Sequence, residues 1–188
     1  MTLSTLDRQS ALIVIDLQKG IVGRPLSAPV EPVIANAAKL AAAFRANGLP
    51  VVLVNVDGGA PGRTETVRPN VAPPADWAEL VPELGRAESD ILVTKRTWGA
   101  FTNTDLAAQL KARGVTQIVL AGVATSIGVE TTAREGYALG FNVALATDAM
   151  TDLRPGAHDH SIAVIFPRLG ESGTTADILA LLDGGPAR

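Results

Sequence analysis

The chain has 188 residues, of which 47% are hydrophobic and 19% are charged, and its formal net charge is −3. This composition predicts one folded domain over residues 1–188, and the slight negative charge argues against a nucleic-acid partner, which would need a basic face. No stretch approaches the roughly 20 apolar residues of a membrane span, and the absence of cysteine excludes a disulfide framework and any thiolate metal site.

Short apolar runs rich in Val, Ile and Leu alternate with helix-like stretches in the first half of the chain. This is the pattern of a parallel sheet that is buried on both faces. The expected elements are a strand, a helix, a second strand and a third strand, over residues 11–15, 33–46, 50–56 and 91–94. The segment of residues 57–74 is rich in Gly, Pro and Arg, and loops of this length in compact domains are often functional.

The second half continues the alternation of helices and strands. The expected elements are a helix, a strand, a helix and a strand, over residues 105–113, 117–121, 127–139 and 141–146. They are followed by a helix interrupted by Pro167, a short sixth strand, a terminal helix and a frayed tail, near residues 156–166, 169–172, 175–182 and 184–188. The order predicts a doubly wound, Rossmann-like α/β fold, a three-layer sandwich with a mostly parallel sheet of five to six strands.

Three of the expected strands end in features that suit chemistry. Asp16 follows the first strand, Lys95 follows the third, and the turn of residues 124–128 follows the fourth. The carboxyl ends of such strands meet at one edge of the sheet, where open α/β folds bind their ligands. A buried Asp–Lys pair has pKa values that depend strongly on desolvation, and a helix N-terminus offers N–H groups to developing negative charge. The sequence therefore predicts a site for a small polar molecule at this edge.

Each of these residues also has a structural interpretation. An aspartate at a strand end, such as Asp16, is common as a turn former, and Lys95 could belong to a solvated basic pair with the residue that follows it. Gly128 could serve close helix packing alone, and either Thr125 or Ser126 could cap a helix. A functional role for these residues is favoured because all of them are expected at one edge of the sheet.

Three segments resemble, in the same order, the motifs of the isochorismatase-like (cysteine hydrolase) superfamily. They are Val14-Ile15-Asp16-Leu17-Gln18, the lysine segment of residues 94–101, and the segment of residues 122–134. The resemblance implies a catalytic triad of Asp16, Lys95 and position 128, together with a non-proline cis peptide between Val123 and Ala124. It also implies an assembly of two or more copies.

Most members of that superfamily carry a cysteine where this chain has Gly128. Because glycine has no nucleophilic atom, the thiol route is closed. The isochorismatase branch also lacks the thiol and cleaves a vinyl ether with water, using the aspartate as a general acid. The resemblance therefore implies a cofactor-independent hydrolase acting on a small molecule through Asp16 and Lys95. The alternatives are a ligand-binding pseudoenzyme derived from a cysteine amidohydrolase, or a structural subunit.

Residues around the triad are expected to contact substrate: Gln18, Trp98, Phe101, Val123, Ala124, Thr125, Ser126 and Ile127. Trp98 and Phe101 could form an apolar wall, although ordinary core packing explains their spacing equally well. Three arginines could receive a substrate carboxylate, and solvent exposure is the simpler interpretation of each: Arg63, Arg68 and Arg96.

The two histidines, His158 and His160, are expected to have structural or rim roles. No metal is expected, because the nicotinamidase branch of the superfamily uses an Asp/His cluster where this chain has Asp57-Gly58-Gly59 and no histidine. The start of the chain lacks a basic patch followed by an apolar run, and together with the absence of cysteine this predicts a cytoplasmic protein. No cofactor is expected.

Overall fold

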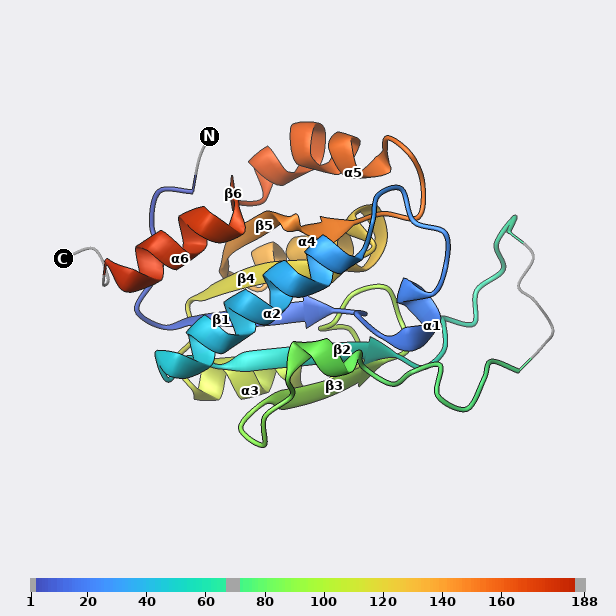
Figure 1. The fold of residues 1–188 in the computed structure, drawn as a ribbon, viewed down its shortest axis with the longest axis horizontal. Helices are drawn as coiled ribbons and strands as arrows, with labels where there is room; N and C mark the ends of the chain where they lie inside the picture. Colours follow the sequence, from blue (N-terminus) through green and yellow to red (C-terminus); the bar gives the residue numbers. More distant parts are fainter. Residues whose placement is uncertain (1–2, 67–71, 185–188) are drawn as a thin grey trace.

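The computed structural model describes residues 3–66 and 72–184, and its centre is a six-stranded parallel sheet (Figure 1). The strands are β1 (Ser10–Ile15), β2 (Val51–Val56), β3 (Ile91–Lys95), β4 (Gln117–Val123), β5 (Asn142–Thr151) and β6 (Glu171–Gly173). Their spatial order is β3-β2-β1-β4-β5-β6, which is the doubly wound order of Rossmann-like folds. The predicted α/β class, the parallel sheet and the short sixth strand are confirmed.

Helical segments connect the strands. They are α1 (Lys19–Val22), α2 (Glu31–Ala46), η1 (Pro82–Leu84), α3 (Leu106–Ala112), η2 (Thr125–Val129), α4 (Glu130–Ala138), α5 (Ala157–His160), η3 (Ser161–Ile165), η4 (Phe166–Arg168) and α6 (Thr175–Asp183). Here η1 and η4 are 3-10 turns, whereas η2 and η3 are π-helical turns. Among the described residues, no helix is both long enough and apolar enough to cross a membrane.

Two hydrophobic clusters form the core, one on each face of the sheet. Alternate residues of β1, such as Leu12 and Val14, pack with α2 and α6, whereas Ile13 and Ile15 pack with α3, α4 and the segment around Phe166. Figure 1 shows α2 crossing one face, with α3 and α4 behind the sheet. The three layers explain why nearly every residue of β1 and β4 is apolar: both faces of these central strands are buried.

The strand order reverses between β1 and β4, because the chain builds outward from β1 to β3 before it crosses to β4. The carboxyl ends of β1 and β4 therefore flank a topological switch point. The two strands approach closely there, since Ile15 pairs with Gly122. Gly122 has φ +117, and a Cβ at this position would lie 2.0 Å from the Ile15 carbonyl oxygen. Only glycine allows this approach of the two backbones.

The helices differ from the prediction more than the strands do. Instead of one helix over residues 127–139, η2 begins at Thr125 and α4 follows it. The Val129 amide donates to the Ala124 carbonyl at 3.2 Å and so closes a wider turn than that of an α-helix. The expected helix near residues 156–166 is likewise divided into α5 and η3. The short α1 and η1 were not expected, and β5 runs five residues beyond its predicted end, to Thr151.

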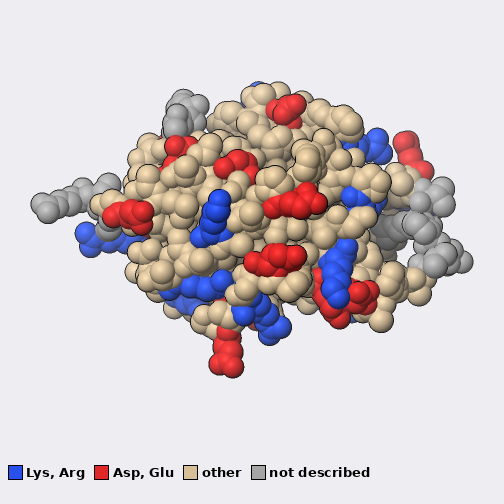
Figure 2. All heavy atoms as spheres, viewed as in Figure 1, with Lys and Arg blue, Asp and Glu red and all other residues tan. Residues whose placement is uncertain are grey.

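Acidic and basic side chains are interspersed on the face seen in Figure 2. Lys and Arg side chains lie beside Asp and Glu side chains, as the formal net charge of −3 leads one to expect. This face therefore shows no extended basic patch.

Candidate active site

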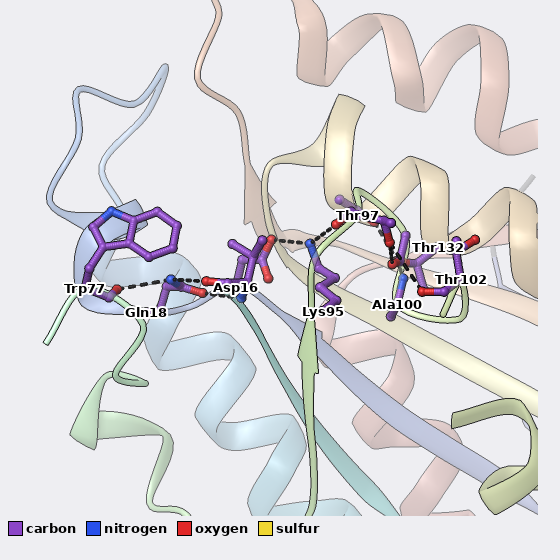
Figure 3. Close-up of polar contacts among 11 residues, drawn as sticks. Asp16, Gln18, Trp77, Lys95, Thr97, Ala100, Thr102 and Thr132 are labelled. Carbon is purple, nitrogen blue, oxygen red and sulfur yellow. Dashed lines mark hydrogen bonds and ion pairs between the residues drawn. The ribbon is translucent and has the colours of Figure 1, made fainter. Parts of the chain in front are cut away.

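The carboxylate of Asp16 and the ammonium of Lys95 form a buried ion pair at the carboxyl edge of the sheet (Figure 3). Asp16 directly follows β1, and Lys95 is the last residue of β3. Lys95 Nζ lies 2.8 Å from Asp16 Oδ2, and the two side chains are only 2% and 8% exposed. Lys95 Nζ also donates to the Thr97 carbonyl at 3.2 Å. The two charges are thus in direct contact.

The environment of Asp16 favours the protonated form of its carboxyl group. Burial raises the pKa of Asp16 to about 6, and the charge and hydrogen bond of Lys95 only partly offset that increase. Asp16 Oδ1 is buried and has no hydrogen-bond partner among the described residues. The backbone of Asp16 has φ +50, a left-handed conformation that is uncommon outside glycine. A buried, half-satisfied carboxylate on a strained backbone is typical of functional sites.

Position 128 faces the same carboxylate. A Cβ built on Gly128 would lie 3.3 Å from Asp16 Oδ2, 3.5 Å from the Val123 carbonyl and 2.8 Å from Ile15 Cγ2. A side chain here would therefore point at Asp16, but the methyl group of Ile15 already occupies part of its space. Ile15 belongs to buried β1, and its contact with position 128 could not be predicted from the pattern of the strand.

The turn between β4 and α4 contains the cis peptide between Val123 and Ala124 that the resemblance implied. Asp152, at the end of β5, accepts a hydrogen bond from the Ser126 amide at 2.7 Å and is itself buried. Sequence reasoning missed Asp152 because the fifth strand was expected to end before it. With its actual end at Thr151, Asp152 is one more aspartate that directly follows a strand.

The hydroxyl of Thr125 points toward β5. Thr125 Oγ1 donates to the Thr151 carbonyl at 3.0 Å and lies 2.9 Å from Nδ1 of His158, which is half-buried on α5. The hydroxyl has a single hydrogen, so both contacts are satisfied when His158 Nδ1 carries a proton and donates it. Because β4 separates β5 from β1, this hydroxyl is directed away from Asp16. The geometry favours a structural role for Thr125 and His158. His160 lies exposed at the end of α5.

The buried amide of Gln18 joins β1 to β2 and to the segment before η1. Gln18 Nε2 donates to the carbonyls of Val56 and Trp77, both at 3.1 Å, and Gln18 Oε1 accepts from the Val56 amide at 2.7 Å. The indole of Trp77 covers Gly20, where a Cβ would lie 2.0 Å from Trp77 Cδ1. Figure 3 shows the indole standing on the far side of Gln18 from Lys95. Trp77 was not among the predicted site residues.

The other predicted contact residues take different positions. Phe101 is 7% exposed and its ring stacks on Phe141 with a centroid distance of 5.8 Å, which favours the core-packing interpretation. Trp98 is 65% exposed and lies close in sequence to Lys95. Val123 and Ala124 are buried in the core cluster on the α2 face, and partly buried Ile127 packs against the same cluster.

A threonine of α4 connects the turn at position 128 with the lysine segment. Thr132 Oγ1 donates to the Gly128 carbonyl at 2.7 Å and accepts from the Ala100 amide at 3.1 Å. Thr132 is fully buried, and Figure 3 shows it beside Ala100 and Thr102. One hydroxyl therefore holds together two of the three segments that form the site.

The remaining charged candidates lie at the surface. Arg96 is paired with Asp57 at 3.4 Å, and both side chains are more than half exposed. Arg63 is exposed, and Arg68 lies outside the described residues. No group of three or more His, Cys, Asp and Glu side chains that could hold a metal ion occurs in residues 3–66 and 72–184. A groove lined by Leu53, Leu92 and Thr94 lies on the face of the sheet opposite to the Lys95 side chain. Successive residues of a strand point to opposite faces, and Thr94 directly precedes Lys95 in β3.

The chain is similar to several known proteins. The family model described as "Isochorismatase domain" matches residues 10–177. The chain is 46% identical to the isochorismatase family protein YwoC of Bacillus subtilis, over 92% of this chain and 93% of that protein. It is 32% identical to the ureidoacrylate amidohydrolase RutB of Stutzerimonas stutzeri, over 78% of this chain and 71% of RutB. An isochorismatase family protein from Burkholderia thailandensis has a similar solved structure, with a TM-score of 0.91, 41% identity and coverage of 97% of this chain and 100% of that chain.

Proposed function

The chain belongs to the isochorismatase family, and from this premise we propose that it is a hydrolase that acts on a small molecule through Asp16 and Lys95 without a thiol. The observation that carries the proposal is the buried ion pair, in which Asp16 Oδ1 has no hydrogen-bond partner within residues 3–66 and 72–184. A buried acceptor without a partner costs free energy, and a substrate that exchanges a proton with this oxygen would remove that cost.

In this proposal Asp16 is the general acid. With its pKa raised to about 6, roughly a tenth of the Asp16 carboxyl groups carry a proton at pH 7. Lys95 engages Oδ2 and stabilises the carboxylate that remains after the proton has left, while Oδ1 is available to the substrate. Positioned proton transfer of this kind accelerates reactions by about 10²- to 10⁴-fold.

We infer that Gly128 occupies the position of the cysteine nucleophile, because it lies within the segment of residues 122–134 that resembles the nucleophile motif of the superfamily. Its distance of 3.3 Å, measured from a built Cβ to Asp16 Oδ2, supports this correspondence. With no thiol in the chain, water is the nucleophile. Backbone amides near position 128 would stabilise the developing negative charge. The bonds that fit are a vinyl ether, which takes the proton on its terminal carbon before water adds, and a C–N bond, whose leaving nitrogen takes the proton. In either case the water that attacks gives one of its own protons back to the Asp16 carboxylate.

The relative RutB, a ureidoacrylate amidohydrolase, supports the inclusion of C–N bonds among the candidates. The family resemblance also supports assembly into a homodimer or a larger homo-oligomer, with a small molecule as the only other partner. Size-exclusion chromatography with light scattering measures that assembly directly.

A non-catalytic binding protein is the second candidate. It is favoured by the Ile15 methyl group, which lies 2.8 Å from a Cβ built at position 128 and narrows the space of a former nucleophile. Under this alternative the ion pair holds a small ligand without turnover. Calorimetric binding of an amide, a ureide or an enol ether, with no product after long incubation, would support it over the hydrolase.

The hydrolase proposal predicts a particular pH dependence. When a panel of enol ethers, amides and ureides is assayed for product, kcat/KM for the active substrate should be constant below about pH 6 and fall about tenfold per pH unit above it. The sign follows from the donor, because only protonated Asp16 can give up a proton. A value of kcat/KM that rises through pH 6 would instead identify Asp16 as a base and contradict the assignment.

A further inference from the structure

Glu135, on α4, holds the turn that follows the lysine segment. Its Oε2 atom accepts a hydrogen bond from the Phe101 amide at 2.9 Å, and its Oε1 atom accepts a short hydrogen bond from the Thr102 hydroxyl. A Cβ at Gly99 would lie 2.1 Å from Glu135 Oε2, so the close approach of the turn to this carboxylate depends on a glycine. These three residues of the turn therefore meet one side chain of α4.

A continuous series of hydrogen bonds leads from this turn to the ion pair. The Thr97 hydroxyl donates to the Gly99 carbonyl at 3.0 Å and shares the same hydrogen with the Thr102 carbonyl at 3.4 Å. The Thr97 carbonyl accepts from Lys95 Nζ at 3.2 Å, and the same Nζ atom contacts Asp16 (Figure 3). The position of the Thr97 carbonyl, which is one of the two partners of the ammonium, thus depends on how the turn is held.

We propose that Glu135 is a positioning residue: by fixing the turn of residues 97–102, it keeps the Lys95 ammonium against the Asp16 carboxylate. The inference rests on the proposed function, since it assigns Glu135 a part in tuning the proton donor. The lysine side chain is a flexible stem of four carbons, so its ammonium needs a second partner to stay in one geometry. The turn contains no regular secondary structure that could hold that partner in place.

The pKa of Asp16 distinguishes the positioning role of Glu135 from a purely electrostatic effect of its charge. Among the described residues, Lys95 is the charged group in contact with Asp16, and it lowers the Asp16 pKa. Loosening Lys95 therefore raises the pKa of Asp16. Removing the negative charge of Glu135 would, through space alone, lower the pKa of Asp16, because less negative surroundings favour the ionised carboxylate. The two effects have opposite signs.

The experiment follows the Asp16 carboxyl carbon by NMR in protein labelled with ¹³C at aspartate, across a pH titration. Glu135→Gln keeps the size of the side chain but leaves one acceptor oxygen where there were two. Thr102→Val removes one attachment of the turn and leaves α4 and its charge intact. Both variants are expected to raise the Asp16 pKa by roughly one pH unit, the lower end of the effect of a neighbouring opposite charge.

The matched control is Glu130→Gln. Glu130 is an acidic residue of the same helix, but its carboxylate binds Arg134 and the Ser161 hydroxyl, not the turn. This variant should move the Asp16 pKa by no more than a few tenths of a pH unit. An unchanged or lowered Asp16 pKa in both Glu135→Gln and Thr102→Val would overturn the positioning role. Because the titration needs no substrate, it tests Glu135 even if the assay panel yields no product and the proposed function fails.

Discussion

Replacement of Asp16 with Asn is expected to lower kcat by about 10²- to 10⁴-fold on whichever substrate the parent protein hydrolyses, because an amide cannot supply the proton that the leaving group needs. The carboxamide has nearly the same shape and can still accept a hydrogen bond from Lys95 Nζ, which lies 2.8 Å from Oδ2 in the parent. The loss should therefore fall mainly on kcat and less on KM. Steady-state kinetics of purified parent and variant, at pH 6, measure it.

The control is Asp57→Asn. Asp57 follows β2 at the same edge of the sheet, but its carboxylate is more than half exposed and pairs with Arg96 at 3.4 Å. An exposed pair of this kind contributes little, so this variant should keep the parent kcat. If Asp16→Asn, still folded by circular dichroism, keeps kcat within a few-fold of the parent, Asp16 is not the proton donor.

A side chain at position 128 is expected to destabilise the protein. Gly128→Ala should lower the free energy of unfolding by about 1–3 kcal/mol, the usual effect of forcing an extra methyl group into a packed interior. The clash is with Ile15 Cγ2, which lies 2.8 Å from a built Cβ. Ile15 is fully buried and β-branched, so its methyl group cannot rotate away freely. Urea unfolding of the parent and the variant measures the loss.

A double-mutant cycle identifies Ile15 as the cause. Ile15→Ala removes the clashing methyl group, so Gly128→Ala should be less destabilising in that background than alone, by about 1 kcal/mol or more. Gly62→Ala is the control, because a Cβ at Gly62 meets no atom of the described residues within 4 Å. The same contact predicts that Gly128→Cys alone gains no amidase activity. Additive single effects, or a harmless Gly128→Ala, would show that Ile15 does not close this space.

The strands were predictable because burial on both faces imposes a continuous apolar sequence. Residues 11–15 and 117–121 are such runs, and they lie in the central strands β1 and β4. Even β6, with three residues, was expected near its place. The helix boundaries were less predictable, since hydrogen bonds between distant segments decide them. The contact of Asp152 with the Ser126 amide, for example, joins residues far apart in the sequence and lies at the first turn of η2.

The charged part of the site was predictable from topology alone. Asp16 and Lys95 each stand at the end of a short apolar strand, and a doubly wound sheet brings such ends to one edge. Side-chain directions were not predictable in the same way. The spacing of Trp98 and Phe101 gave no basis for one being exposed and the other stacked in the core. Glu135 also gave no local signal, because its hydrogen-bond partners lie in a turn more than thirty residues away.

We propose that burial, partly offset by Lys95, makes Asp16 a proton donor near neutral pH, and a ¹³C titration of the Asp16 carboxyl group measures the pKa on which this role depends. The expected pKa is about 6 in the parent protein and higher in Lys95→Met, because Lys95 lowers it. A parent pKa near the ordinary value of 3.8, or a value that Lys95→Met leaves unchanged, would contradict the claim.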